Sequence, residues 1–456
     1  MNVIYLNTHD IGRYIEPYGY KIPAPNLQRF AEDGTLLRHC YCAGPTCSPS
    51  RAAMLTGMCA HSSGMTGLAH RGFSLNEPSQ HLANFLKGHD YETVLVGGQH
   101  EVSHKDPRGG IQALGYDHHI RVESGPYEQE PDKSRHGIIH AVEQGRAAAE
   151  FIRTKQGQGQ PFFMALGLGV THRDFPRAAN DINPNYLRPM YPMYDCAAMR
   201  QDMADYCEAV RALDTAIGHV LDALRETGLY EQSVIFFTTD HGPAFPRMKC
   251  TLYDTGIGVS FIMDYPDNPA RGQALDTLVS QVDVFPTVCE LLGFDPPDYL
   301  QGVSFAPALR GETDAVRDEI YSEVSYHAAY EPMRCVRTDR YKLIRCFDEE
   351  WEGHVSANTD PSPSKTMYHE AGWMKRPRAK ELLFDLWLDP VERENVADDP
   401  QYAEVYNSLS IRLREWMEQT DDPLLKAEKG RIVPPAGAKV NTRSCIHATD
   451  PEHESW

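Results

Sequence analysis

Histidines and acidic residues follow four predicted strands of this 456-residue chain, at the point where each strand ends. They are His9 and Asp10, His100, His172, and Asp240 with His241. Because ligands in parallel sheets lie beyond the carboxyl ends of the strands, we expect these side chains to meet at one sheet edge. One of them alone would be an ordinary turn residue. Carboxylates and imidazoles gathered at one edge indicate a divalent metal ion flanked by acid–base groups.

A further reactive element is the segment Cys-Ser-Pro-Ser-Arg at residues 47–51. Pro49 suits the first turn of a helix, and Ser48 is predicted to cap that helix. Cys47 would then lie at the positive end of the helix dipole, where an anion is also favoured. A buried cysteine beside a helix-capping serine is the alternative interpretation.

These residues must be positioned by the elements around them, and the first two-thirds of the chain alternates strand-length apolar runs with helix-period stretches. Buried strands are predicted at residues 3–6, 93–96, 162–166 and 234–238. A long helix with apolar residues at positions 210, 213, 217, 220, 221 and 224 is predicted to end at Gly228. The pattern predicts an α/β fold: a large mixed, mostly parallel sheet sandwiched by helices.

From residue 332 the pattern changes. Residues 333–346 read as a β-hairpin that turns at residues 338–340. A polar, proline-containing loop at 348–380 and a helix at 402–417 follow, and the tail after Glu428 is expected to dock as irregular chain. We therefore predict a catalytic domain over residues 1–331. A smaller α+β domain over 332–456 would hold a four-stranded antiparallel sheet with an inserted loop.

Charge and composition exclude several classes of function. The chain has 44 Lys plus Arg against 64 Asp plus Glu, a net charge of −20, which argues against nucleic-acid binding. A focused pocket can still gather enough cations for a single anion. The N-terminal segment lacks a signal-peptide pattern, apolar runs are too short to span a membrane, and 11 cysteines fit no disulfide framework. We expect a cytoplasmic protein without a membrane partner.

The motifs together resemble the formylglycine-dependent sulfatases of the alkaline phosphatase superfamily. The similar segments are residues 47–57, 238–242, 249–256, 282–287 and 337–344, in the family's order. The first resembles the recognition sequence at which the family's cysteine is oxidised to an aldehyde. Within the family the chain is most similar to the N-sulfoglucosamine sulfohydrolase (sulfamidase) group, through residues 47–57, 61–68 and 242–253.

The resemblance implies a sulfatase, a hydrolase of a sulfate ester or N-sulfate on a sulfated sugar or small organic sulfate. Cys47 would be converted to formylglycine by a formylglycine-generating enzyme, and the hydrated aldehyde would attack sulfur. The implied ligands of one divalent metal ion are His9, Asp10, Cys47, Asp240 and His241. The implied catalytic residues are Cys47, Arg51, His100, His172 and Lys249.

The resemblance also implies a role for each catalytic residue. Arg51 would steady the hydrated aldehyde, and Lys249 would bind the sulfate and help to neutralise the leaving group. His172 would protonate the leaving oxygen or nitrogen. His100 would take up the proton when the hydrate collapses to the aldehyde.

The chain departs from the family pattern at the predicted metal site. Many members have two acidic residues where this chain has His9 and Asp10, and many have Asn in place of His241. Calcium is the family's usual ion, but imidazole ligands favour manganese or zinc. His9 either coordinates the metal or lies outside its coordination sphere.

A second departure concerns the sulfate-binding cations. The family usually has Lys two residues before the histidine matched by His100, and Gly98 stands there. Lys105 and Arg173 are the candidates to supply the missing charge. The loop at 348–380 is a further candidate for the border of the substrate pocket, with an ordinary surface insertion as the alternative. Its aromatic and basic residues are Trp351, Tyr368, His369, Trp373 and Lys375.

Two other functions stay open from the sequence. One is a phosphonate monoester or phosphodiester hydrolase of the same superfamily, because some of these also use formylglycine with an Asp–His metal pair. The other is a non-catalytic protein that binds sulfated glycans, which predicts a lost nucleophile or metal set. The remaining histidines, such as His61, are expected to be structural or exposed. A homo-oligomer is an expectation for which the sequence carries no signal.

Overall fold

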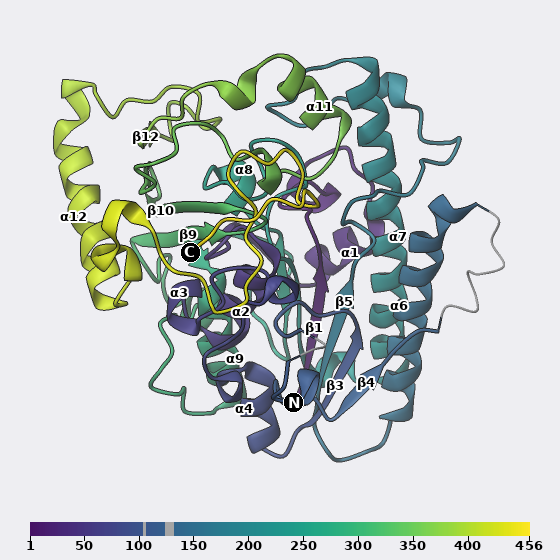
Figure 1. Ribbon diagram of the computed structural model, residues 1–456. Helices are drawn as coiled ribbons and strands as arrows, with labels where there is room; N and C mark the ends of the chain where they lie inside the picture. The colour runs from purple at the N-terminus through teal and green to yellow at the C-terminus, as the bar shows by residue number, and fades with distance from the viewer. Residues whose placement is uncertain (104–105, 124–131) are drawn as a thin grey trace.

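A mixed sheet of eight strands forms the centre of the computed structural model, which describes residues 1–103, 106–123 and 132–456 (Figure 1). Its strand order is β4-β3-β5-β1-β6-β7-β2-β8. The strands are β1 (Asn2–Thr8), β2 (Thr35–Tyr41), β3 (Glu92–Gly97), β4 (His118–Ile120), β5 (Phe162–Leu168), β6 (Ser233–Thr239), β7 (Phe261–Asp264) and β8 (Gln273–Ser280). All neighbours are parallel except β7, which runs antiparallel to β6 and β2.

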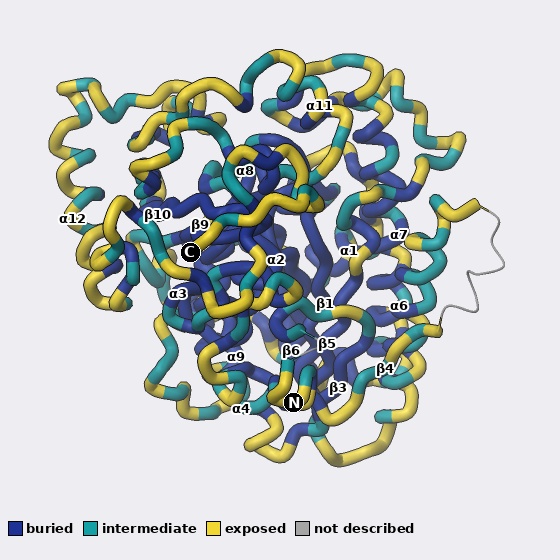
Figure 2. The backbone as a smooth tube through the Cα atoms, in the orientation of Figure 1, coloured by how far each residue is buried: buried dark blue, intermediate teal, exposed yellow. Residues whose placement is uncertain are grey.

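The four strands predicted from apolar runs are confirmed as β1, β3, β5 and β6. β1, β5 and β6 are buried along their whole length, as expected for strands covered on both faces (Figure 2). The parallel register places Thr8 beside Leu168 and Thr239, and Gly97 beside Gly167. The residues that follow these four strands therefore emerge at the same edge of the sheet.

Helices cover both faces of the sheet. Successive side chains of each strand point to opposite sides, so each strand contributes to two cores. Ile4 and Leu6 pack in one core with α1 (Pro25–Asp33), α6 (His136–Thr154) and α7 (Ala197–Thr227). Val3 and Tyr5 pack in another with α2 (Cys47–Thr56), α4 (Leu82–Gly88) and α9 (Val284–Leu292). α7 ends at Gly228 with φ 72°, as predicted. Within the described residues, no helix is both long enough and apolar enough to cross a membrane.

The C-terminal third contains a second, antiparallel sheet in the order β12-β11-β10-β9. Its strands are β9 (Glu319–Tyr326), β10 (Tyr330–Thr338), β11 (Tyr341–Cys346) and β12 (Glu381–Asp385). Pairing of β10 with β11 confirms the predicted hairpin. The predicted boundary between residues 331 and 332 falls inside β10, and β9 precedes it. The division into two domains stays a prediction.

Short and C-terminal helices complete the fold. They are α3 (Ala60–Ser63), α8 (Asp254–Ile257), α10 (Ala306–Leu309), α11 (Pro363–Glu370) and α12 (Ala403–Gln419). α12, predicted at 402–417, packs Leu409 and Leu413 against the second sheet. The tail after Glu428 docks as irregular chain. One of the contacts that hold it is a 2.7 Å hydrogen bond from Arg71 to Oδ1 of Asn441 in the tail. His61 of α3 is structural as predicted, and its Nδ1 lies 2.9 Å from Glu323 Oε1 on β9.

A buried ion cluster joins the second sheet to the segment that carries Lys249. Lys342 of β11 is 0% exposed, and its Nζ lies 2.5 Å from Asp254 Oδ1 and 2.6 Å from Glu392 Oε1. Arg337 of β10 pairs with the other oxygen of Asp254 at 3.1 Å. Because buried charges need counter-charges, this cluster fixes the second sheet against α8.

Replacing Lys342 with Met should lower the free energy of unfolding by about 3–5 kcal/mol, since Glu392 would be left buried without its counter-charge. Urea denaturation measures the change. The matched control is Lys426→Met, whose exposed ion pair with Asp421 should contribute little. Equal denaturation midpoints for the two variants would show that the buried cluster does not stabilise the fold.

Candidate active site

Cys47 is the first residue of α2, and every residue of that helix is buried. Pro49 lies in the first turn as predicted, but the prediction that Ser48 caps the helix was wrong. The N-cap is Thr46, and the Ser48 hydroxyl accepts a hydrogen bond from the backbone of Ala69 at 3.0 Å instead. The helix thus begins two residues earlier than a Ser48 cap requires, and Cys47, 2% exposed, faces the sheet edge.

The loops after β1, β5 and β6 are locked together by short polar contacts. Asp240 Oδ1 accepts hydrogen bonds from the backbone N–H groups of Asp10 and His241, both at 3.0 Å. Thr171, after β5, donates through its hydroxyl to the carbonyl oxygen of His9 at 2.6 Å. Asp10 takes a left-handed conformation with φ 52° at this crossing point. These contacts hold the predicted residues in one fixed arrangement.

The five predicted metal ligands come together at this edge. Ligand atoms of His9, Asp10, Cys47 and Asp240 all lie within 4.8 Å of one another, and His241 Nε2 lies 3.5 Å from Cys47 Sγ. His9 Nδ1 is 3.0 Å from Asp240 Oδ2. Asp10 Oδ1 is buried and makes no hydrogen bond to a described residue. A buried oxygen that accepts no hydrogen bond from a described residue and has the His241 Nε2 atom at 3.4 Å fits a divalent cation among imidazole and carboxylate groups.

The two aspartates of this group differ in their electrostatics. Burial raises the pKa of Asp10 and outweighs the attraction of the Lys249 ammonium. Burial also acts on Asp240, but His241 and His9 outweigh it and hold the pKa of that carboxyl well below its usual range. Asp240 is therefore ionised at neutral pH and is the stronger anionic donor for a cation.

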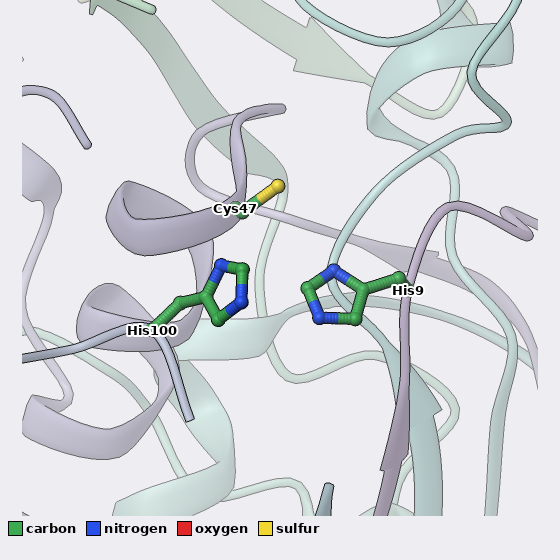
Figure 3. A group of neighbouring side chains, drawn as sticks. All are labelled: His9, Cys47 and His100. Carbon is green, nitrogen blue, oxygen red and sulfur yellow. The ribbon is translucent and has the colours of Figure 1, made fainter. Parts of the chain in front are cut away.

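The predicted acid–base residues surround Cys47. His9, Cys47 and His100 point toward one another from three different segments (Figure 3). Burial and the neighbouring His9 lower the pKa of His100 to about 4. Lys249 and burial oppose protonation of His172, but Asp10 and a hydrogen bond to Cys47 raise its pKa to about 9. At neutral pH one imidazole is thus neutral and the other protonated.

Two cations lie at the same place. Lys249 Nζ is 3.1 Å from Asp10 Oδ2 and 3.5 Å from His172 Nε2. Arg51 is buried, and its Nε lies 3.4 Å from Asp240 Oδ2. Burial disfavours the Cys47 thiolate, yet Lys249 and the surrounding imidazoles hold the pKa of Cys47 well below its usual range. The site therefore stabilises negative charge at residue 47.

Arg173 and Lys105 are the two candidates for the positive charge that the family's lysine supplies at the position of Gly98. Arg173 does not supply it, because its guanidinium pairs with Asp202 at 2.9 and 2.6 Å and donates to the Ala244 carbonyl. Lys105 lies outside the described residues. Among the described residues that we predicted for this site, Lys249 and Arg51 are the cations that lie beside Cys47.

Sequence reasoning missed two residues from the C-terminal third. Asp360 Oδ2 lies 3.0 Å from Lys249 Nζ, so the loop at 348–380 does reach the site. His327, between β9 and β10, is buried close enough to influence Lys249, Cys47 and Asp360 electrostatically. Neither residue follows a strand of the central sheet or belongs to a motif, so no local signal marked it.

The family model "Sulfatase" matches residues 1–294, and "N-sulphoglucosamine sulphohydrolase, C-terminal" matches residues 247–376. The human N-sulphoglucosamine sulphohydrolase is 26% identical over 90% of this chain and 88% of its own length. These matches confirm the resemblance seen in the motifs.

Two solved structures share the fold. A 2-O GAG sulfatase superposes with a TM-score of 0.72 at 19% identity, covering 100% of this chain and 98% of that one. The phosphonate monoester hydrolase of Agrobacterium radiobacter gives a TM-score of 0.67 at 19% identity, with coverages of 92% and 96%. The predicted fold, a large mostly parallel mixed sheet with a smaller antiparallel one, is confirmed.

The ligand set predicts that the protein binds a divalent ion. The binding can be measured as a change in protein stability, without an activity assay. Mn²⁺ at 100-fold over its Kd should raise the free energy of unfolding by about 2.7 kcal/mol, seen as a higher Tm. Asp240→Asn should abolish the shift, and His9→Gln should weaken Mn²⁺ more than Ca²⁺. Asp264→Asn, a buried and ion-paired aspartate on β7, is the matched control. An unchanged Mn²⁺ shift in Asp240→Asn would place the ion elsewhere.

Proposed function

Because the chain belongs to the sulfatase family and is therefore a sulfuric ester hydrolase, we propose that it removes sulfate from a sulfated sugar. The proposed reaction uses a formylglycine at position 47 and one divalent metal ion. The observation that carries the proposal is the position of Cys47, at the start of buried α2 within 4.8 Å of three metal-ligating groups. Lys249 and His172 border the same place.

The proposed nucleophile is formed, and the proposed metal ion is bound, after the chain has been synthesised. We propose that a formylglycine-generating enzyme oxidises Cys47, which gives a hydrated aldehyde whose hydroxyl can attack sulfur. A divalent ion held by His9, Asp10, Asp240 and His241 would supply Lewis-acid polarisation of a sulfate oxygen. Imidazole donors favour Mn²⁺ or Zn²⁺ over the Ca²⁺ that is usual in the family.

The charges of the side chains support separate roles in the reaction. Lys249 and Arg51 supply positive charge for the sulfate oxygens and for residue 47. His172, with a pKa near 9, is protonated at neutral pH and is suited to protonate the leaving atom. His100, with a pKa near 4, is neutral and is suited to accept a proton from residue 47. Environments that push two pKa values apart are typical of acid–base pairs.

The substrate class is inferred from relatives. The human relative is named as acting on N-sulphoglucosamine, and one structural neighbour is named as a GAG sulfatase. A sulfated sugar is therefore the favoured substrate, with the sulfate on oxygen or nitrogen. The net charge of −20 favours a small anionic substrate over a long polyanion.

A phosphonate monoester or phosphodiester hydrolase is the second candidate. It is favoured by the structural likeness to the phosphonate monoester hydrolase and by the Asp240–His241 pair. A non-catalytic glycan-binding protein would require a lost nucleophile or metal set. Cys47 and the metal-ligating residues are instead all retained and lie together.

The location and assembly of the protein stay predictions. We propose a cytoplasmic location from the cysteine content, because eleven cysteines, an odd number, match no disulfide framework. Assembly into a homo-oligomer likewise stays a prediction.

Formylglycine formation should lower the intact mass by about 18 Da, a change confined to the peptide that contains residue 47. Cys47→Ala should lack this change and lose sulfatase activity by a factor of at least about 10³, since the nucleophile is removed. Cys196→Ala, at a partly exposed cysteine before α7, is the control and should keep both. Fully active protein that contains only unmodified Cys47 would contradict the mechanism.

Rates on a matched pair of substrates separate the two candidate reactions. We expect a larger kcat/KM for 4-nitrophenyl sulfate than for 4-nitrophenyl phenylphosphonate, because the chain belongs to the sulfatase family. Both should be measured on one preparation with known metal and formylglycine content. A clear preference for the phosphonate would overturn the proposed function in favour of the second candidate.

A further inference from the structure

Lys249 contacts two carboxylates, and only one of them belongs to the proposed metal site. Its Nζ lies 3.1 Å from Asp10 Oδ2 and 3.0 Å from Asp360 Oδ2. Asp360 comes from the loop between β11 and β12, more than one hundred residues later in the chain. Its Oδ2 is buried and accepts no hydrogen bond of good geometry from a described residue. Asp360 therefore has hydrogen-bonding capacity left for a ligand.

His327 provides a second polar group with unused capacity nearby: two residues after it, the Ala329 backbone N–H donates to Asn358 Oδ1 at 2.8 Å, two residues before Asp360. It is 8% exposed, and its Nδ1 is buried without a hydrogen-bond partner among the described residues. Burial and Lys249 lower its pKa to about 3, so the imidazole is neutral and offers one donor and one acceptor. Its electrostatic neighbours are Lys249, Cys47, Asp360 and His241. A buried polar group without a partner is costly, and a ligand would satisfy it.

We propose that Asp360 and His327 form a subsite for a hydroxyl group on the carbon next to the sulfated one. The proposal rests on the proposed function, in which Lys249 binds the sulfate. Since Asp360 contacts Lys249 directly, the group that it recognises must be a close neighbour of that sulfate. A carboxylate only accepts hydrogen bonds, so the group must donate. A sugar hydroxyl donates to Asp360 and can also pair with the neutral His327.

The charge of Asp360 adds a selection against further anions. Burial opposes its ionisation, but Lys249 outweighs burial and lowers the pKa of Asp360 to about 2. A second sulfate or a carboxylate on the neighbouring carbon would face this charge and be repelled. The subsite thus accepts a hydroxyl beside the sulfate and rejects a substrate that is sulfated on both carbons. This makes Asp360 a specificity-determining residue contributed by the C-terminal third.

Three simple probes test the subsite without knowledge of the natural sugar. They are trans-2-hydroxycyclohexyl sulfate, cyclohexyl sulfate, which lacks the hydroxyl, and the 1,2-disulfate. Each is measured by kcat/KM, or by its competitive inhibition constant against 4-nitrophenyl sulfate. The holoenzyme should prefer the hydroxy ester over cyclohexyl sulfate by roughly 10- to 100-fold, since a site with unpaired polar groups discriminates against a ligand that lacks the hydroxyl.

Substitutions then assign the preference to the two residues. Asp360→Ala and His327→Ala should each reduce the preference to within about threefold, and Asp360→Asn should raise the relative binding of the disulfate. Glu352→Gln removes one exposed charge from the same loop and should leave the preference unchanged. Tm values identify any variant that fails to fold. If an alanine variant fails, the test relies on Asp360→Asn, which keeps the shape of the side chain and removes its charge.

Two results would overturn the subsite. One is a holoenzyme that handles the two monosulfates equally. The other is a variant series in which both substrates lose the same factor, because Asp360 would then act only by orienting Lys249. These failures differ from failure of the proposed function, in which the holoenzyme would hydrolyse the aryl phosphonate and none of the sulfate esters.

Discussion

The carboxylate of Asp240 is the interaction on which the site depends. One of its oxygens receives backbone N–H groups from the loops after β1 and β6, and the other faces Arg51 of α2 and His9. A buried ionised carboxylate costs several kcal/mol unless it is paired and hydrogen-bonded. The fold meets this requirement by bringing a helix and two strand ends to one point. The same contacts place Cys47 beside the candidate metal ligands.

The acidic protein nevertheless gathers several cations at one buried place. With a net charge of −20, the protein surface offers little attraction to long polyanions. Inside, Arg51, Lys249 and a protonated His172 are held near residue 47 in a buried region where electrostatic interactions are strong. A single small anion can therefore be bound with specificity, although the molecule as a whole repels anions.

The C-terminal third takes part in the site as well as in the fold. Lys342 and Arg337 pair with Asp254, which follows Lys249 by five residues, so the second sheet supports the segment that carries Lys249. Asp360, from the loop between β11 and β12, pairs with Lys249, and His327, between β9 and β10, is close enough to interact with the lysine electrostatically. Variation in this loop would change what surrounds Lys249 without changing the candidate metal ligands. Sulfatases can in this way differ in substrate while keeping one reaction.

The sequence by itself determined the central strands, the residues that follow them and the reactive segment around Cys47. Those features are local: buried strands are continuous apolar runs, and parallel strands must end at one edge. The tertiary structure alone decided that Thr46 rather than Ser48 precedes α2, that Arg173 pairs with Asp202, and that Asp360 pairs with Lys249. These pairings join residues far apart in the chain. They depend on how the two sheets and their loops pack, and no local pattern records that packing.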